Sequence, residues 1–211
     1  MSDVNRRDAL KAFAAVSMAS VLDFSPPTVE RALRGMERLE EQGAPYTPKF
    51  FNRHEWRTVR MLADYVIPRD DRSGSATDAK VPEFIDFLMS DKDASESSKT
   101  SMRGGLSWLD NQARHRFGKS FVDASDAQRR TILDDIAWPK KAKPEFSHGV
   151  SFFNRFRDLT ASGFFSSEMG WTDVQYIGNT FNPNWNGCPP AALEKLDVSY
   201  DVMNSRTNSP K

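Results

Sequence analysis

The sequence has a single cysteine, Cys188, and only three histidines among its 211 residues. One thiol cannot close an internal disulfide, and together with three scattered histidines it cannot complete a Cys/His metal cage. None of the histidines has a nucleophile or a second metal ligand at a useful spacing, so we interpret all three as surface or packing residues: His54, His115 and His148. These shortages argue against a zinc site and against nucleophilic catalysis by this chain.

An excess of charge is also missing, because 29 Lys and Arg residues are balanced by 29 Asp and Glu residues. A neutral chain has no long-range field that draws it to nucleic acid or to anionic lipid. No glycine-rich loop of the phosphate-binding type is present, so the chain is not expected to bind a dinucleotide cofactor by itself. The acidic pair Asp70-Asp71 lacks the spacing of a calcium loop, and we interpret it as part of a solvated loop rather than as a divalent-cation site.

The apolar run at the start of the chain is too short to span a bilayer, which takes about 20 residues. This run, residues 12–22, follows a charged start that contains Arg6, Arg7, Leu10 and Lys11. The order is typical of a signal peptide, and the arginine pair resembles the twin-arginine export signal. No clean Ala-x-Ala cleavage site follows, so residues 1–24 are predicted to be a twin-arginine signal peptide that is either cleaved or kept as an anchor. The alternative is an ordinary amphipathic N-terminal helix.

Helical periodicity is what the chain has instead, with apolar residues recurring every three or four positions. Capping boxes at Asn52 and Ser125 predict the starts of two helices, and prolines end both. Gly163 is predicted to end the last clear helix, and Gly104 and Gly105 weaken an earlier one by roughly 1 kcal/mol each. The predicted helices cover about residues 27–43, 52–68, 82–88, 102–118, 125–138 and 146–162. Alternating strand patterns are absent, so we predict an all-α fold, with one domain of about six helices over residues 25–211.

Beyond Gly163 the helical periodicity fades, and an irregular, aromatic C-terminal segment follows. One interpretation is a tail that folds back over the helices. The other is a recognition surface, since exposed aromatic rings and stiff turns suit a protein interface. Cys188 is also a candidate for a disulfide to a partner in an oxidising compartment. The candidate partner-binding residues are Phe164, Phe165, Trp171, Tyr176, Asn179, Trp185 and Cys188.

Three blocks of sequence carry a resemblance to a known family. The first is the leader with its arginine pair. The second, which we call the proline block, spans residues 63–86 and begins Ala-Asp-Tyr-Val-Ile-Pro-Arg-Asp and ends Val-Pro-Glu-Phe-Ile-Asp. The third, the C-terminal block, spans residues 152–188 and contains Leu-Thr-Ala-Ser-Gly-Phe-Phe-Ser-Ser. Together they resemble the gluconate 2-dehydrogenase subunit 3 family, the small subunits of flavoprotein dehydrogenases.

The resemblance implies that this chain has no catalytic residues of its own. It implies a non-catalytic subunit that escorts a large catalytic subunit of the glucose-methanol-choline type through folding and through export by the twin-arginine translocation machinery. The catalytic subunit is expected to hold FAD and to oxidise a sugar or polyol, and a cytochrome c subunit is implied as a further partner. The complex is expected in the periplasm, in association with the inner membrane, and no nucleic acid is expected as a partner.

Two other functions stay open on the residues alone. A stand-alone periplasmic enzyme would need a constellation of catalytic side chains, and the sequence contains no recognisable one. A periplasmic binding or structural module, tethered to the membrane by an uncleaved leader, fits the weak cleavage site and needs no dehydrogenase partner.

Overall fold

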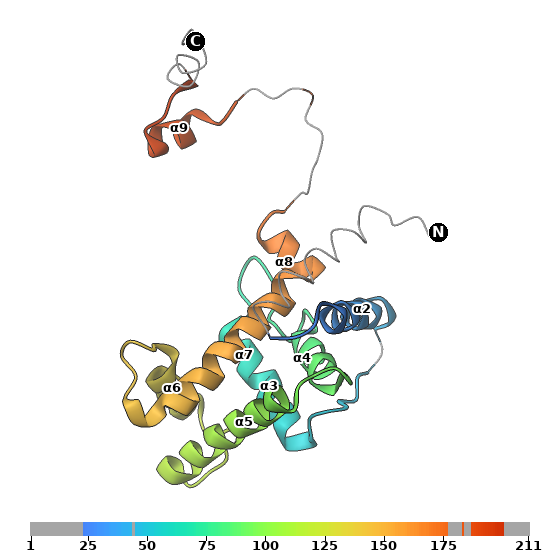
Figure 1. The fold of residues 1–211 in the computed structure, drawn as a ribbon. Coiled ribbons are helices and arrows are strands. Elements are labelled where there is room, and N and C mark those ends of the chain that lie inside the picture. Colours follow the sequence, from blue (N-terminus) through green and yellow to red (C-terminus); the bar gives the residue numbers. More distant parts are fainter. Residues whose placement is uncertain (1–22, 44, 177–182, 184–186, 201–211) are drawn as a thin grey trace, which may run out of the picture. The chain divides into compact units, whose positions relative to one another are not determined.

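The computed structural model describes residues 23–43, 45–176, 183 and 187–200 (Figure 1). The chain divides into a first unit, residues 1–176, and a second unit, residues 177–211. Several residues singled out in the sequence lie outside the described residues: Arg6, Arg7, Leu10, Lys11, Asn179 and Trp185.

The predicted all-α class is confirmed, because the described residues form helices and no strand. With labels as in Figure 1, the first unit contains α2 (Pro26–Gln42), α3 (Arg53–Val66), α4 (Val81–Ser90), α5 (Glu96–Phe117), α6 (Asp126–Ala137), the 3-10 turn η1 (Pro144–Phe146), α7 (Ser147–Phe165) and α8 (Glu168–Asp173). The second unit contains α9 (Pro190–Leu196). None of the described helices combines the length and the apolar character needed to cross a bilayer.

Both predicted capping boxes are present. The Asn52 side chain accepts hydrogen bonds from the backbone amides of His54 and Glu55, and the Glu55 carboxylate accepts one from the amide of Asn52. Ser125 and Gln128 make the same reciprocal pair at the start of α6. These side chains bind the amides that a first helical turn leaves without partners, which explains why local sequence located both helix starts.

The prediction that Gly163 ends the last clear helix is wrong, because α7 continues through it to Phe165. A Cβ atom at Gly163 would lie 2.8 Å from the ring of Phe84 on α4. This glycine therefore serves the close approach of α7 to α4 rather than the end of a helix.

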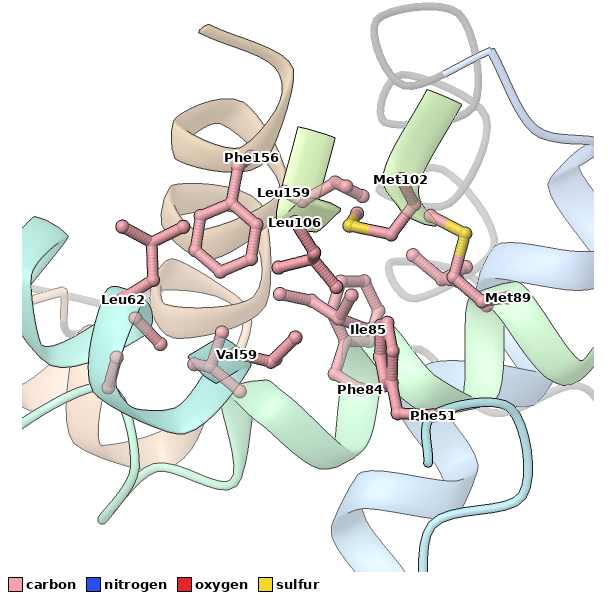
Figure 2. Packing of buried hydrophobic residues seen from close by; sticks show 14 of the residues in the cluster. Phe51, Val59, Leu62, Phe84, Ile85, Met89, Met102, Leu106, Phe156 and Leu159 are labelled. Atoms are coloured by element: carbon pink, nitrogen blue, oxygen red, sulfur yellow. The ribbon is translucent and has the colours of Figure 1, made fainter. Parts of the chain in front are cut away.

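The hydrophobic core is built around α7, which contacts α3, α4, α5, α6 and α8, while α2 packs against α4. Figure 2 shows the centre of this packing, where the side chains of five segments meet: Phe51, Val59, Leu62, Phe84, Ile85, Met89, Met102, Leu106, Phe156 and Leu159. All of them are buried, and each fully buried side chain of this size stabilises the fold by about 1.5–3 kcal/mol.

The two adjacent glycines of α5 have different surroundings. A Cβ atom at Gly105 would lie 1.9 Å from the ring of Phe152, whereas one at Gly104 would meet nothing within 4 Å. Gly105 therefore allows the close packing of α5 on α7, and Gly104 makes no such contribution.

Candidate functional site

The proline block and the C-terminal block meet in the core, where Gly163 approaches Phe84, and also at the surface of the first unit. The loop that follows α3 lies against α8, where the Arg72 guanidinium donates a hydrogen bond to the backbone carbonyl of Asp173 and lies 3.4 Å from its carboxylate. Gly74 allows this approach, since a Cβ atom there would lie 2.9 Å from the sulfur of Met169 on α8. Residues of both segments also line a cavity of about 490 Å³, among them Asp78 and Glu168.

Two acidic residues of this loop, Asp70 and Asp78, are bound by the loop itself. Asp70 accepts hydrogen bonds from the amides of Arg72 and Ser73, and these bonds hold the pKa of its carboxyl below the usual value. Asp78 accepts from the amide and hydroxyl of Ser75 and from Arg69, which lowers its pKa as well, the backbone bond most strongly. Among the described residues no cluster of three or more potential metal ligands is present. The acidic side chains thus shape the turn.

Asp86, the last residue of the proline block, ties the segment before α3 to α4. Its carboxylate is fully buried and accepts hydrogen bonds from the Tyr46 hydroxyl at 2.6 Å and from three backbone amides at 2.8–3.1 Å, those of Lys49, Phe50 and Phe51. A buried carboxylate is stable only with such a set of donors. Burial and the bond to Asp86 in turn raise the pKa of the Tyr46 hydroxyl.

The turn from α7 into α8 is fixed by two small residues. The Ser167 hydroxyl donates to the carbonyl of Phe164 at 2.6 Å and accepts from the amide of Gly170 at 3.1 Å, which caps α8. A Cβ atom at Gly170 would lie 2.1 Å from the same carbonyl oxygen, so only glycine fits this position. Together with the Arg72 contact, this turn holds α8 in one orientation on the first unit.

The segment from the end of α7 through α8 presents large apolar side chains to solvent. We call this set the α8 aromatic surface: Phe165, Trp171, Val174 and Tyr176, which are 46%, 38%, 53% and 59% exposed. Trp171 and Tyr176 lie edge to face with ring centroids 6.2 Å apart. Exposed rings that contact each other on an ordered helix and the turn after it are the kind of feature that protein interfaces bury.

The structure separates the candidate residues predicted from the sequence. Phe165, Trp171 and Tyr176 lie together on the α8 aromatic surface, whereas Phe164 is only 1% exposed and belongs to the core. Cys188 is an exposed free thiol in the second unit, and its amide donates to the Tyr200 hydroxyl at 2.6 Å.

Sequence reasoning missed the exposure of Val174 and the contact of Arg72 with Asp173. No apolar spacing around Val174 indicates that its side chain is exposed. The Arg72–Asp173 contact joins residues far apart in the chain, so no local pattern predicts it. His54, interpreted as a surface or packing residue, has its ring nitrogen Nε2 2.5 Å from the Asp110 carboxylate. The other oxygen of Asp110 accepts from the amide of Phe121, so this pair links α3 to α5 and to the loop after α5.

Comparison with known proteins gives one match. No curated protein and no solved structure matches the chain. The sequence model of the family described as gluconate 2-dehydrogenase subunit 3 matches residues 53–186. The match covers more than half of the chain, from the start of α3 past the end of α8, and contains the whole proline block and the α8 aromatic surface. The chain therefore belongs to the gluconate 2-dehydrogenase subunit 3 family.

Proposed function

We propose that this chain is the non-catalytic small subunit of a periplasmic, FAD-dependent sugar or polyol dehydrogenase complex and binds the catalytic subunit through the α8 aromatic surface. The observation that carries the proposal is this surface, because its rings are exposed on and beside α8, which the Arg72–Asp173 contact and the Ser167 cap hold in place. Membership of a dehydrogenase subunit family supports the assignment of the partner.

The α8 aromatic surface has the composition of an interface centre. Tyr and Trp are enriched among the residues that contribute most to protein binding. The rings are already ordered by the edge-to-face contact of Trp171 and Tyr176, so little conformational entropy is lost on binding. In this proposal the partner supplies the FAD, and this chain supplies no catalytic group.

The leader adds the second part of the proposal, an escort role. Arg6 and Arg7 are the pair that the twin-arginine translocation machinery would recognise, and that machinery carries folded cargo. A catalytic subunit of the glucose-methanol-choline type that lacks its own leader would then be exported bound to this chain. A partner that binds only the folded chain also stabilises it by mass action. A cytochrome c subunit would complete the complex at the inner membrane.

Co-purification tests the partner. The full chain, tagged at its C-terminus in its native host, is expected to elute with a large flavoprotein in stoichiometric amount and with the absorbance of bound flavin. A colourless chain that elutes alone contradicts the proposal and favours the membrane-tethered module, for which the weak cleavage site is the supporting observation. Electrophoresis of the complex without reducing agent shows whether Cys188 forms a disulfide with the partner.

A separate experiment tests the escort role. Replacing the arginine pair, as Arg6→Lys and Arg7→Lys together, is expected to leave both proteins in the cytoplasm and to remove dehydrogenase activity from the periplasm. Replacing Arg53 and Arg57 by Lys in the same way is the control, because these exposed residues lie outside the leader. Normal periplasmic activity with the altered leader would show that the catalytic subunit is exported independently.

A further inference from the structure

The connection between α6 and α7, residues 138–146, is an ordered and exposed loop that we call the Trp138 loop. The backbone carbonyl of Trp138 accepts hydrogen bonds from the amides of Lys141 and Ala142 at 2.8 and 3.0 Å, which closes a tight turn. Pro139 and Pro144 restrict the backbone further. The loop lies on the side of the first unit away from α2, and α8 lies at the opposite end of α7 from it (Figure 1). It is therefore separate from the α8 aromatic surface.

The loop presents one large ring and three cations. Trp138 is 62% exposed, although burial of an indole would stabilise the fold, and the side chains beside it are exposed lysines: Lys140, Lys141 and Lys143. The Lys141 ammonium lies 5.9 Å from the centre of the Trp138 ring, so a molecule that binds the loop meets a charge and an apolar ring together. Within the described part of the chain no carboxylate forms an ion pair with any of the three lysines.

The neighbouring charges leave the loop basic. Glu145 is the one acidic residue of the loop, so residues 138–146 carry a net charge of about +2. Arg116 lies over the ring of Phe146 at 5.3 Å, but its charge is balanced by Asp135 at 2.6 Å. Because the whole chain is neutral, the basic loop does not produce a long-range field, and its attraction acts within about one Debye length, roughly 8 Å at physiological ionic strength.

The residue types distinguish a lipid surface from a protein partner. Lysine is depleted in protein interfaces, where arginine supplies the cations, because its mobile ammonium is costly to order and to desolvate. At the surface of an anionic bilayer the same mobile ammonium is suited to phosphate groups, and each lysine there is worth about tenfold or less in affinity. Tryptophan is enriched at the headgroup level, where the ring is apolar and the indole N–H still meets water.

We propose that the Trp138 loop binds an anionic phospholipid surface, with the Trp138 ring at the headgroup level and the three lysines on lipid phosphates. The turn of Trp138 on Lys141 and Ala142 orders the loop before contact, so binding does not have to order it. The contact would orient the first unit on the membrane, and it needs no dehydrogenase partner. It can therefore be measured on this chain alone, and its failure leaves the proposed function untouched.

Fluorescence quenching by brominated lipids locates the ring. The full chain is mixed with vesicles of phosphatidylcholine and phosphatidylglycerol whose acyl chains carry bromine. Residues 1–22 contain no tryptophan, so binding of the leader does not by itself place a quenched ring in the bilayer. We expect quenching of the wild-type chain, at least a twofold smaller quenched fraction for Trp138→Phe, and wild-type quenching for the matched variant Trp171→Phe. Equal quenching of all three proteins would overturn the proposal.

Charge reversal tests the lysines. Lys140→Glu with Lys141→Glu is expected to lower the partition coefficient into anionic vesicles, measured by quenching, by at least tenfold. Raising the salt concentration should lower the partition coefficient of the wild-type chain in the same way. The matched variant, Lys49→Glu with Lys92→Glu, makes the same change of net charge at exposed sites outside the loop and is expected to change the partition by less than twofold. Equal partition into neutral and anionic vesicles refutes the lipid assignment. Loss of the flavoprotein on replacement of Trp138, without any vesicle binding, would instead assign the loop to a protein partner.

Discussion

The proline block and the α8 aromatic surface both lie in the segment that matches the family model, residues 53–186, but their side chains have different surroundings. In the proline block Asp70 and Asp78 accept hydrogen bonds from their own loop, and Asp86 is buried with four donors around it. On the α8 aromatic surface, large rings stay exposed although the core beneath them is closed. One part of the segment therefore maintains the fold, and the other part is available to a partner.

The largest expected effect comes from Asp86. Replacing Asp86 by Ala leaves one buried hydroxyl and three amides without an acceptor, so we expect a loss of about 4 kcal/mol in the free energy of unfolding. Chemical denaturation measures it. The control is Asp71→Ala in the exposed loop, which should change stability by less than about 0.5 kcal/mol. Similar stability of the two variants would remove the distinction between the two regions.

The two glycines of α5 give the next largest effect and a matched pair. Gly105→Ala would place a Cβ atom 1.9 Å from Phe152, and we expect it to destabilise the fold by about 3 kcal/mol. Gly104→Ala has open space around it and should stabilise the helix by about 0.5–1 kcal/mol. Thermal melting of both variants measures these changes. A stabilising Gly105→Ala would mean that α5 and α7 are farther apart than described.

Changes on the α8 aromatic surface should separate binding from stability. Trp171→Ala together with Tyr176→Ala is expected to weaken binding to the catalytic subunit about 30-fold, or about 2 kcal/mol. Both rings are exposed in the free chain, so their removal takes contacts from the interface rather than from the core. The melting temperature of the chain alone should change little. Phe164→Ala, in the core, should do the reverse and destabilise the chain by about 3 kcal/mol. Unchanged affinity in the double variant would place the interface elsewhere.

The smallest effect concerns an ion pair that links α2 to the end of α4. The Arg31 guanidinium donates to the Asp91 carboxylate at 2.7 and 2.8 Å, and this hydrogen bonding lowers the pKa of Asp91 to about 2. A lowered pKa in the folded state stabilises the fold above the unfolded value of 3.8, and the stabilisation is lost as the pH falls toward 2. Because Arg31 is half-exposed and screened, we expect about 1 kcal/mol.

Asp91→Asn checks this expectation. The variant should be about 1 kcal/mol less stable than the wild type at pH 7, and the difference should shrink between pH 4 and pH 2. Denaturation at several pH values measures the difference. A difference that stays constant down to pH 2 would mean that packing, not charge, explains the loss.

Local patterns predicted much of the fold. The capping boxes at Asn52 and Ser125 lie within four residues of the groups they bind, so sequence alone located both helix starts. The start of α5 was missed, because its first turn is polar and its cap, Ser95, precedes no apolar residue. The role of Gly163 was misread, because the reason for it is the ring of Phe84, far away in the chain.

The candidate site was predicted less completely. The aromatic segment was recognisable from composition, but sequence could not show that Phe164 faces the core and Phe165 faces solvent. Which of two adjacent rings is buried depends on the side of α7 that meets α4, and this is set by packing. The contact of Arg72 with Asp173 depends on the same tertiary arrangement.

The central claim is that the α8 aromatic surface binds the catalytic subunit, and amide hydrogen exchange tests it most directly. Exchange is measured on the full chain alone and in the purified complex. We expect at least tenfold slower exchange at residues 165–176 in the complex, with little change at residues 63–86. A complex in which residues 165–176 exchange as fast as in the free chain would contradict the claim.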